Sequence, residues 1–177
     1  MPKATVFCGS AKPYGVTRSM CRAAERYLRT VGYEVDMLFL ADMHIDHCTD
    51  CGACLHRSCV RDDDMHIVYD SFSSSDLLIL ASPIHFSGPS SIIKTAMDRF
   101  QVYWYDRTLK HPAKCLALLC GGSEKPRFEY TVSIFRAFAL TTGMEWLGHL
   151  EVPDTDRNGD TGVPAMVTEF LESVIKP

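Results

Sequence analysis

The chain has 177 residues, of which 46% are hydrophobic and 23% are charged, which is typical of a globular domain and excludes a disordered chain. The 18 basic and 22 acidic residues give a formal net charge of −4, so no basic excess is present to drive nonspecific nucleic-acid binding. No apolar stretch reaches the roughly 18 residues that span a membrane, and no signal peptide opens the sequence, so we expect a cytoplasmic protein without a membrane partner.

Apolar runs and helical periodicities alternate along the chain. Residues 4–8 form a short apolar run that predicts a buried strand, and apolar residues spaced three and four apart predict a helix over 16–31 that ends at Gly32. A second strand is predicted over 34–40. The pattern then lapses over about 41–62, and connections of that length inside a compact domain are usually functional.

The same alternation continues to the end of the chain. The acidic residues 62–64 precede a short predicted helix over 65–72, where they complement the helix dipole. A third buried strand is predicted over 76–81, and one helix is predicted over 89–105. The remaining predicted elements are a strand over 113–120, a helix over 128–140, a strand within 144–152 and a helix beginning at Pro164.

These elements predict an α/β fold with a parallel sheet covered on both faces, because the strands are continuously apolar. Five such strands are typical of a flavodoxin-like doubly wound sheet with strand order 2-1-3-4-5, here with the cysteine-rich segment 41–62 inserted after strand 2. We expect one domain over residues 1–177. Ligands of such sheets bind beyond the carboxyl ends of the strands, so the loops after Cys8 and Ala81 are the candidate site.

The loop after the first strand, residues 9–18, has the chemistry of an anion site. Backbone N–H groups at a helix N-terminus bind anions, Ser10 and Thr17 can donate hydroxyl hydrogen bonds, and Lys12 or Arg18 can supply charge. A phosphate monoester fits these groups. An ordinary turn with surface charges would have the same composition, and neither a dinucleotide fingerprint nor a P-loop is present.

The loop after the third strand, residues 82–88, combines rigid, aromatic and small polar residues. It can present backbone groups and a flat side chain to a planar ring. The alternative is an ordinary connection in which Pro83 ends the strand and Ser87 caps the next helix. His85 is the one candidate acid or base, although a lone histidine is more often a hydrogen-bonded structural residue than a catalyst.

The run Cys48-x2-Cys51-x2-Cys54-x4-Cys59 is the most specific feature of the sequence. Four thiols within 12 residues can surround one centre, and Gly52 allows a tight bend between them. Three cysteines with this spacing hold one [4Fe–4S] cube in bacterial ferredoxins, and Cys59 can complete the set. A four-thiolate zinc site is the alternative, although zinc usually draws on two separated pairs, and a disulfide or vestigial site is a third reading. The other cysteines are expected to pack as small apolar residues: Cys8, Cys21, Cys115 and Cys120.

Together these motifs resemble the iron–sulfur flavoprotein branch of the NADPH-dependent FMN reductase, flavodoxin-like family. The resemblance covers nearly the whole chain and rests on the loop 9–17, the four-cysteine run, the acidic residues before Met65 and the loop 82–86. Two positions depart from the family pattern. Lys12 stands where Arg is usual, which replaces a bidentate phosphate contact by a point charge, and His85 stands where Tyr is usual.

The resemblance implies FMN and a [4Fe–4S] cluster as cofactors. The residues it assigns to the FMN phosphate are Ser10, Lys12, Val16 and Thr17. Those it assigns to the isoalloxazine ring are Pro83, Ile84, His85 and Phe86, with Gly121 and Gly122 at its edge. The cluster ligands it implies are Cys48, Cys51, Cys54 and Cys59. His85 is the only candidate catalytic side chain, because the cofactors carry the chemistry.

The expected function is that of a redox flavoprotein moving electrons between NAD(P)H or ferredoxin and a flavin, quinone or oxidant acceptor. An enzyme oxidising NAD(P)H and a pure electron carrier both fit, as does an FMN or quinone reductase whose cysteines hold zinc or no metal. A thiol-based structural or sensing protein would not need the phosphate loop. We expect a homodimer or homotetramer, with NAD(P)H binding over the flavin because 177 residues leave no room for a separate nicotinamide domain.

Overall fold

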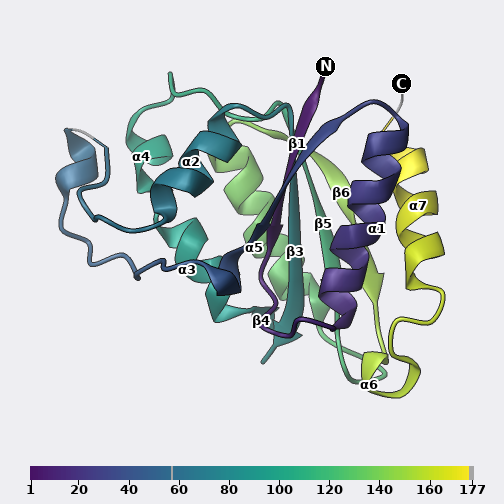
Figure 1. Cartoon of the computed structure of the whole chain (residues 1–177). Coiled ribbons are helices and arrows are strands. Elements are labelled where there is room, and N and C mark those ends of the chain that lie inside the picture. Colours follow the sequence, from purple (N-terminus) through teal and green to yellow (C-terminus); the bar gives the residue numbers. More distant parts are fainter. Residues whose placement is uncertain (57, 176–177) are drawn as a thin grey trace.

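A twisted parallel sheet runs through the middle of the molecule in the computed structural model, which describes residues 1–56 and 58–175 (Figure 1). The strands follow the order β2-β1-β3-β5-β6, and the two-residue β4 pairs with β3 in antiparallel fashion. Since β4 only extends β3 into a hairpin, the predicted order 2-1-3-4-5 of five parallel strands is confirmed. The strands are β1 Lys3–Cys8, β2 Glu34–Phe39, β3 Leu77–His85, β4 Gly88–Pro89, β5 Lys114–Cys120 and β6 Glu145–Val152.

Helices cover both faces of this sheet and divide the core in two. Side chains alternate along a strand, so Val6 of β1 packs under α1 and α7 whereas its neighbour Phe7 packs under α2, α3 and α5. Figure 1 shows α1 and α7 side by side on one face, with α2 to α5 on the other. The helices are α1 Val16–Thr30, α2 Met65–Ser73, α3 Ser91–Asp98, α4 Gln101–Tyr105, α5 Phe128–Thr141, α6 Thr155–Asn158 and α7 Val163–Val174, with short 3-10 turns at Leu40–Asp42 and Ala53–Leu55.

The single helix predicted over 89–105 is wrong, because the structure has two helices there. Pro89 belongs to β4, and Ser90 caps α3 by accepting a hydrogen bond from the N–H of Ile93 at 3.4 Å. The helix then tightens at Arg99 and Phe100, whose N–H groups both donate to carbonyls three residues back instead of four. The apolar pattern continues through this break, so periodicity alone does not reveal it.

The third strand is longer than predicted. It continues past Ala81 to His85, since Ser82 and Pro83 lie in register with β5 and the last two residues pair with β4. This extension carries the strand's carboxyl end beyond its neighbours. α6 follows β6 and was not anticipated by the sequence pattern.

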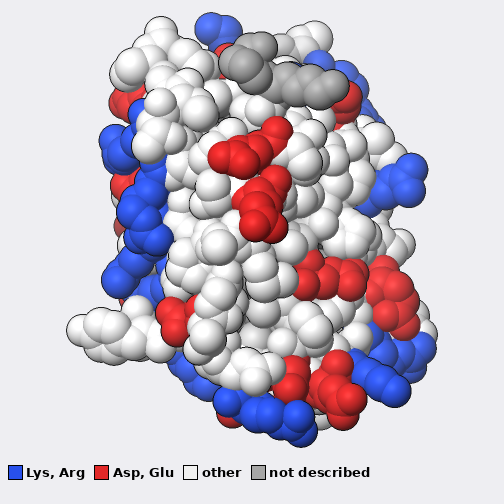
Figure 2. Space-filling model, turned by 90° about the vertical axis from the view of Figure 1, so that its right-hand side faces the viewer, with Lys and Arg blue, Asp and Glu red and all other residues white. Residues whose placement is uncertain are grey.

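The molecular surface has an uneven distribution of charge. Figure 2 shows Lys and Arg side chains in a column along its left edge, where the turn from the view of Figure 1 brings α1. The basic residues of α1 are Arg18, Arg22, Arg26 and Arg29. Within the residues that the structure describes, no helix combines the length and apolar character needed to cross a bilayer.

Candidate functional site

The loop between β1 and α1 gathers polar donors at the carboxyl end of the sheet. α1 begins at Val16. The residue before it is Gly15, which has no side chain to accept hydrogen bonds from the first N–H groups of the helix. Uncapped N–H groups at a helix N-terminus attract anions. Ser10 is buried, and its Oγ accepts a hydrogen bond from the N–H of Lys12 at 3.3 Å, which fixes the turn. The geometry is therefore compatible with the predicted phosphate site.

Gly9 lets this loop approach α3 closely. A Cβ at this position would lie only 2.8 Å from both the Ile93 Cβ and the Ser90 Oγ. The Ser90 hydroxyl in turn donates to the Gly9 carbonyl at 2.6 Å. The first residue of the loop is thus clamped against the start of α3.

The loop after the third strand forms a tight hairpin. β3 and β4 are joined by Phe86 and Ser87, which both have positive φ values, 49° and 68°. Two central residues with positive φ are characteristic of the two-residue hairpin turn, and non-glycine residues rarely adopt that conformation. Phe86 is fully exposed on this turn, while Pro83 and Ile84 are half-buried.

The end of β3 and the loops after β1, β5 and β6 line a cleft of about 840 Å³, which we call the strand-end cleft. Its volume lies within the range of about 300–1,000 Å³ that is usual for ligand pockets. The cleft brings together most of the residues that the sequence assigned to FMN: Ser10, Lys12, Val16, Thr17, Pro83, Ile84, His85 and Gly122.

Two predicted FMN residues do not line the cleft among the residues that the structure describes. Phe86 is exposed on the hairpin turn. Gly121 lies under Pro126, where a Cβ would come within 2.3 Å of the proline ring, so it shapes the loop after β5 instead of facing the cleft.

Sequence reasoning missed the loop after β6. Thr155, Asp156 and Asp160 line the cleft, and the Ser19 hydroxyl donates to Asp160 Oδ2 at 2.9 Å, which ties this loop to α1. The available signal was position, since the loop follows the carboxyl end of the last strand. Arg22 of α1 also lines the cleft and was not anticipated.

Of the cations near the predicted phosphate site, Arg18 is already paired. Its Nη2 donates to both carboxylate oxygens of Asp42 at 3.0 and 3.1 Å, and its guanidinium lies 4.3 Å from the centroid of the Phe39 ring. The side chain is nearly buried, so this pair anchors α1 to the end of β2. Lys12 is exposed at the cleft and is the cation of the loop itself that can meet a phosphate, while Arg22 and Arg26 of α1 line the cleft farther along the helix.

The cysteines outside the run are buried, which confirms that they pack in the core: Cys8, Cys21, Cys115 and Cys120. Cys120 also borders the cleft, where its Sγ lies 3.2 Å from the Thr17 Oγ1. Burial raises the pKa of Cys120 and of Cys115 above the ordinary thiol value. The Thr17 hydroxyl therefore has a partner in the described structure.

Residues 41–62, which we call the cysteine loop, hold the predicted metal ligands. Gly52, in the left-handed region at φ 73°, turns the chain into the 3-10 turn Ala53–Leu55. The four thiols of the run line one small pocket together with Arg61, Arg99 and Tyr105. Cys51 is exposed and the other three thiols are half-buried.

Backbone and side-chain N–H groups already point at two of these sulfurs. The N–H of Asp50 lies 3.4 Å from the Cys48 Sγ, and the Arg99 Nη2 lies 3.3 Å from the Cys59 Sγ. Burial raises the pKa of the Cys54 thiol, and the three neighbouring thiols raise it further. Because the four thiols line one pocket, they would repel one another as thiolates, and a bound cation would stabilise that arrangement.

The donor set fits an iron–sulfur cluster. Four cysteine thiolates are the ligands of a [4Fe–4S] centre, and hydrogen bonds to the sulfurs together with nearby charge set its potential. In the part of the chain that the structure describes, no three His, Cys, Asp or Glu side chains converge as a site for one metal ion. The thiols surround a pocket instead.

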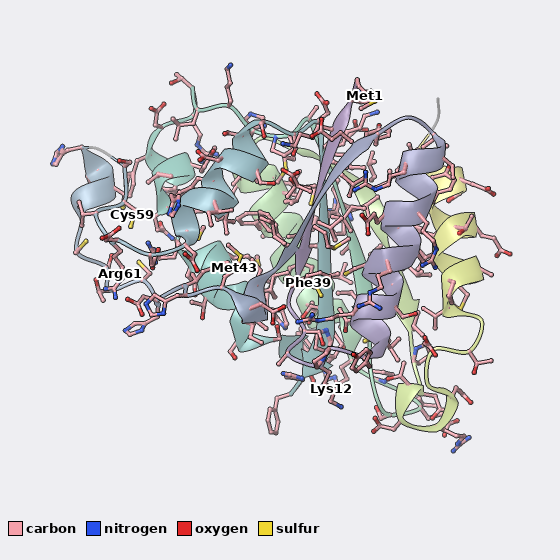
Figure 3. All side chains as sticks on the ribbon, viewed as in Figure 1. Met1, Lys12, Phe39, Met43, Cys59 and Arg61 are labelled. Atoms are coloured by element: carbon pink, nitrogen blue, oxygen red, sulfur yellow. The ribbon has the colours of Figure 1, made fainter. Side chains whose placement is uncertain are left out.

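The strand-end cleft and the cysteine loop lie in different parts of the molecule. Figure 3 shows Cys59 and Arg61 on one flank and Lys12 at the end of the sheet. α3 lies between the two regions in Figure 1, with its first turn against Gly9 and its end at Arg99.

Comparisons with known proteins agree with this architecture. A family model described as NADPH-dependent FMN reductase matches residues 2–153. An iron–sulfur flavoprotein of Archaeoglobus fulgidus is 34% identical, over 97% of this chain and 81% of its own length. An iron–sulfur flavoprotein of Methanocaldococcus jannaschii is 29% identical, over 88% of this chain and 79% of its own.

Solved structures share the fold at low sequence identity. A putative quinone reductase from Klebsiella pneumoniae has a TM-score of 0.76 at 16% identity, covering 99% of this chain and 86% of that one. An NAD(P)H:quinone oxidoreductase from Methanothermobacter marburgensis has a TM-score of 0.73 at 14% identity, covering 95% and 90%. These similarities place the sheet order and the inserted loop in a known fold.

Proposed function

The chain belongs to the NADPH-dependent FMN reductase family, and on that premise we propose that it is an FMN-dependent redox protein that also carries a [4Fe–4S] cluster. In this proposal it moves electrons between NAD(P)H or ferredoxin and a flavin, quinone or oxidant acceptor. The observation that supports it most strongly is that one chain combines a cleft at the strand ends with a separate pocket lined by four thiols.

The chain's own residues would bind and orient FMN in the strand-end cleft. The first N–H groups of α1, the Ser10 hydroxyl and the Lys12 ammonium meet the phosphate, because all three belong to the loop after β1 and the start of α1, which line the cleft. Pro83 and Ile84 present a rigid, partly apolar wall to the isoalloxazine ring. When bound, FMN supplies hydride chemistry with one-electron transfer, and the cluster supplies one-electron transfer alone.

His85 is the candidate for moving a proton at this site. It lies on β3 at the edge of the cleft and is exposed, so a bound ring and water can both reach it. The hairpin turn after it holds its backbone by pairing with Gly88. NAD(P)H would bind over the flavin in the same cleft.

The assembly and location of the protein are part of the same proposal. Trp104 and Tyr105 are exposed and adjacent on α4, where they provide apolar surface for a second copy to cover, which supports a homodimer or homotetramer. All eight cysteines are free in the structure, and free thiols suit the reducing cytoplasm. Light scattering of the purified protein measures the oligomer directly.

Metal and flavin analysis tests the proposal. The protein is purified without oxygen, and iron, zinc, acid-labile sulfide and FMN are measured per chain. We expect about one FMN and about four iron atoms per chain. Zinc without iron would leave an FMN reductase-like protein whose thiols hold zinc, and failure to bind added FMN would overturn the whole proposal.

The electron donor is identified by adding NADPH, NADH and reduced ferredoxin in turn and following the flavin absorbance. Bleaching by a nicotinamide alone indicates an enzyme that oxidises NAD(P)H. Bleaching by ferredoxin alone indicates an electron carrier.

A further inference from the structure

Arg99 is the residue that connects the rigid sheet core to the cysteine loop. It follows the last residue of α3, Asp98, and its side chain is almost completely buried, with 2% of the residue exposed. A buried guanidinium loses its hydration, so it requires partners inside the protein. The partners it has all belong to the cysteine loop or to the residues directly after it.

The Arg99 guanidinium donates hydrogen bonds to three residues, two in the cysteine loop and one directly after it. Its Nη1 donates to the Asp46 carbonyl at 2.9 Å and to Asp63 Oδ2 at 2.5 Å. Its Nη2 donates to Asp63 Oδ1 at 3.2 Å and to the Cys59 Sγ at 3.3 Å. Asp63 holds one edge of the guanidinium through both carboxylate oxygens and so aims the remaining N–H of Nη2 at the sulfur.

The ion pair with Asp63 keeps both groups charged in spite of their burial. An arginine guanidinium stays protonated in proteins, and Asp63 pairs with that of Arg99 through both carboxylate oxygens. Burial would raise the pKa of Asp63, but hydrogen bonds from Arg99 and from the N–H groups of Asp46 and Met65 hold it below its ordinary value. A full positive charge therefore lies beside Cys59.

α3 holds Arg99 at a fixed place relative to the sheet, because hydrogen bonds attach the first turn of the helix to the ends of two strands. At its first turn, the Ser90 hydroxyl donates to the Gly9 carbonyl at 2.6 Å, and the Ser90 N–H donates to the Ser82 Oγ at 2.9 Å. Gly9 and Ser82 directly precede the cleft residues Ser10 and Pro83. The eight residues of α3 span about 12 Å, so one short helix begins at the proposed flavin site and ends at the thiols.

From this geometry we propose that Arg99 is a positioning residue that orients the Cys59 ligand and raises the reduction potential of the cluster. The inference rests on the proposed function. One-electron reduction, with the electron supplied by the donor of the proposed reaction, adds one negative charge to the thiolate-bound centre. An N–H donor carrying positive charge stabilises that added charge, so its removal disfavours reduction.

The test compares four proteins reconstituted anaerobically with iron, sulfide and FMN: wild type, Arg99→Lys, Arg99→Gln and the control Arg127→Gln. Arg127 pairs with Glu129 at the surface and, among the described residues, lines neither the thiol pocket nor the strand-end cleft. Iron content, FMN affinity and the midpoint potential of the cluster are measured for each. Electron paramagnetic resonance follows the cluster during the redox titration.

We expect Arg99→Gln to lower the equilibrium constant for cluster reduction about tenfold, which is about 59 mV for one electron. Arg99→Lys keeps the charge but loses the bidentate contact, so its potential should fall between those of wild type and the Gln variant, and Arg127→Gln should match wild type. If the Gln variant binds FMN normally but no iron, a lowered potential in the Lys variant supports the proposal.

Unchanged potentials in both Arg99 variants would overturn the assignment. So would joint loss of iron and FMN binding in both variants, since that would show a general role in folding. A wild-type chain that takes up no iron would overturn the proposed function and the Arg99 assignment with it. Unchanged potentials on an intact cluster would overturn the Arg99 assignment alone.

Discussion

The strand-end cleft and the cysteine loop are held in place by different forces. The cleft is formed where parallel strands end, and the register of β1, β3 and β5 determines where its loops begin. Among its described residues, the cysteine loop has regular structure only at the end of the 3-10 turn Leu40–Asp42 and in the 3-10 turn Ala53–Leu55. The buried pair of Arg99 with Asp63 attaches it to the core, whereas the pair of Arg61 with Asp46 joins two parts of the loop itself.

This difference has consequences for stability. The sheet is held by many backbone hydrogen bonds, each of which contributes little, and a side-chain substitution in the cleft leaves them in place. Such a substitution should therefore alter ligand binding more than the free energy of folding. A loop held by a buried ion pair depends on one contact, because removal of one partner leaves the other charge unpaired inside the protein. The two regions should therefore respond independently to substitution.

The largest expected effect is loss of the cluster without loss of FMN binding. Cys54→Ser should abolish cluster binding, because it removes one of the four thiols that line the pocket proposed for the cluster. FMN affinity should change less than about twofold, since Cys54 is remote from the cleft. The control Cys115→Ala removes a buried core sulfur, and iron should remain bound. Iron analysis with flavin titration measures both, and joint loss of FMN and iron in Cys54→Ser would refute independence.

The next effect concerns the anchor of the loop. Asp63→Asn should reduce the free energy of unfolding by about 3 kcal/mol, because it leaves the buried Arg99 charge without its partner. Glu129→Gln breaks an exposed pair with Arg127 and should cost less than about 0.5 kcal/mol. Urea unfolding of the apoprotein gives both values. Equal effects of the two substitutions would show that the buried pair does not anchor the loop.

A smaller effect is expected in the cleft. Lys12→Met should weaken FMN binding about tenfold, since it removes the exposed cation at the predicted phosphate site. Riboflavin, which lacks the phosphate, should bind both proteins equally. Lys94→Met is the matched control, because Lys94 pairs with Asp98 on α3 and lies outside the cleft lining of the described residues. Flavin fluorescence quenching measures the affinities, and an equal loss for riboflavin would argue against a phosphate contact at Lys12.

The smallest effect is the pH dependence of the loop anchor. The folded protein holds the pKa of Asp63 below its ordinary value of about 3.9, so this carboxylate stabilises the folded state fully above that pH. The stabilisation disappears as the pH falls through the lower folded-state value. The stability difference between wild type and Asp63→Asn should therefore shrink as the pH falls below about 4, as urea unfolding at several pH values can measure. A difference that stays constant down to pH 3 would contradict this origin.

Periodic patterns were sufficient to predict the framework of the cleft. Continuous apolar strands fixed the parallel sheet and its order, and the switch point then identified the loops after Cys8 and Ala81. Two details escaped this reasoning. The positive φ at Phe86 comes from hairpin pairing with β4, and the loop after β6 joins the cleft through Ser19 and Asp160, a contact between residues far apart in sequence.

The grouping of the four thiols in the cysteine loop was predictable, but the attachment of the loop was not. Local spacing alone placed the thiols around one pocket, as the structure has them. Arg99 and Asp63 pair across 36 positions of the sequence. Arginine and aspartate are usually exposed, so the sequence gives no sign that these two are buried together. The break between α3 and α4, which presents Arg99 to the loop, is hidden because apolar residues continue on both sides of it.

The most direct test of the account is low-temperature electron paramagnetic resonance of the anaerobically reduced, FMN-loaded protein beside its Cys54→Ser variant. The account predicts the signal of a reduced [4Fe–4S] cluster in the wild type and its absence in the variant, with the flavin absorbance equal in both. A wild-type protein that binds FMN and zinc but shows no cluster signal after reconstitution with iron and sulfide would contradict it.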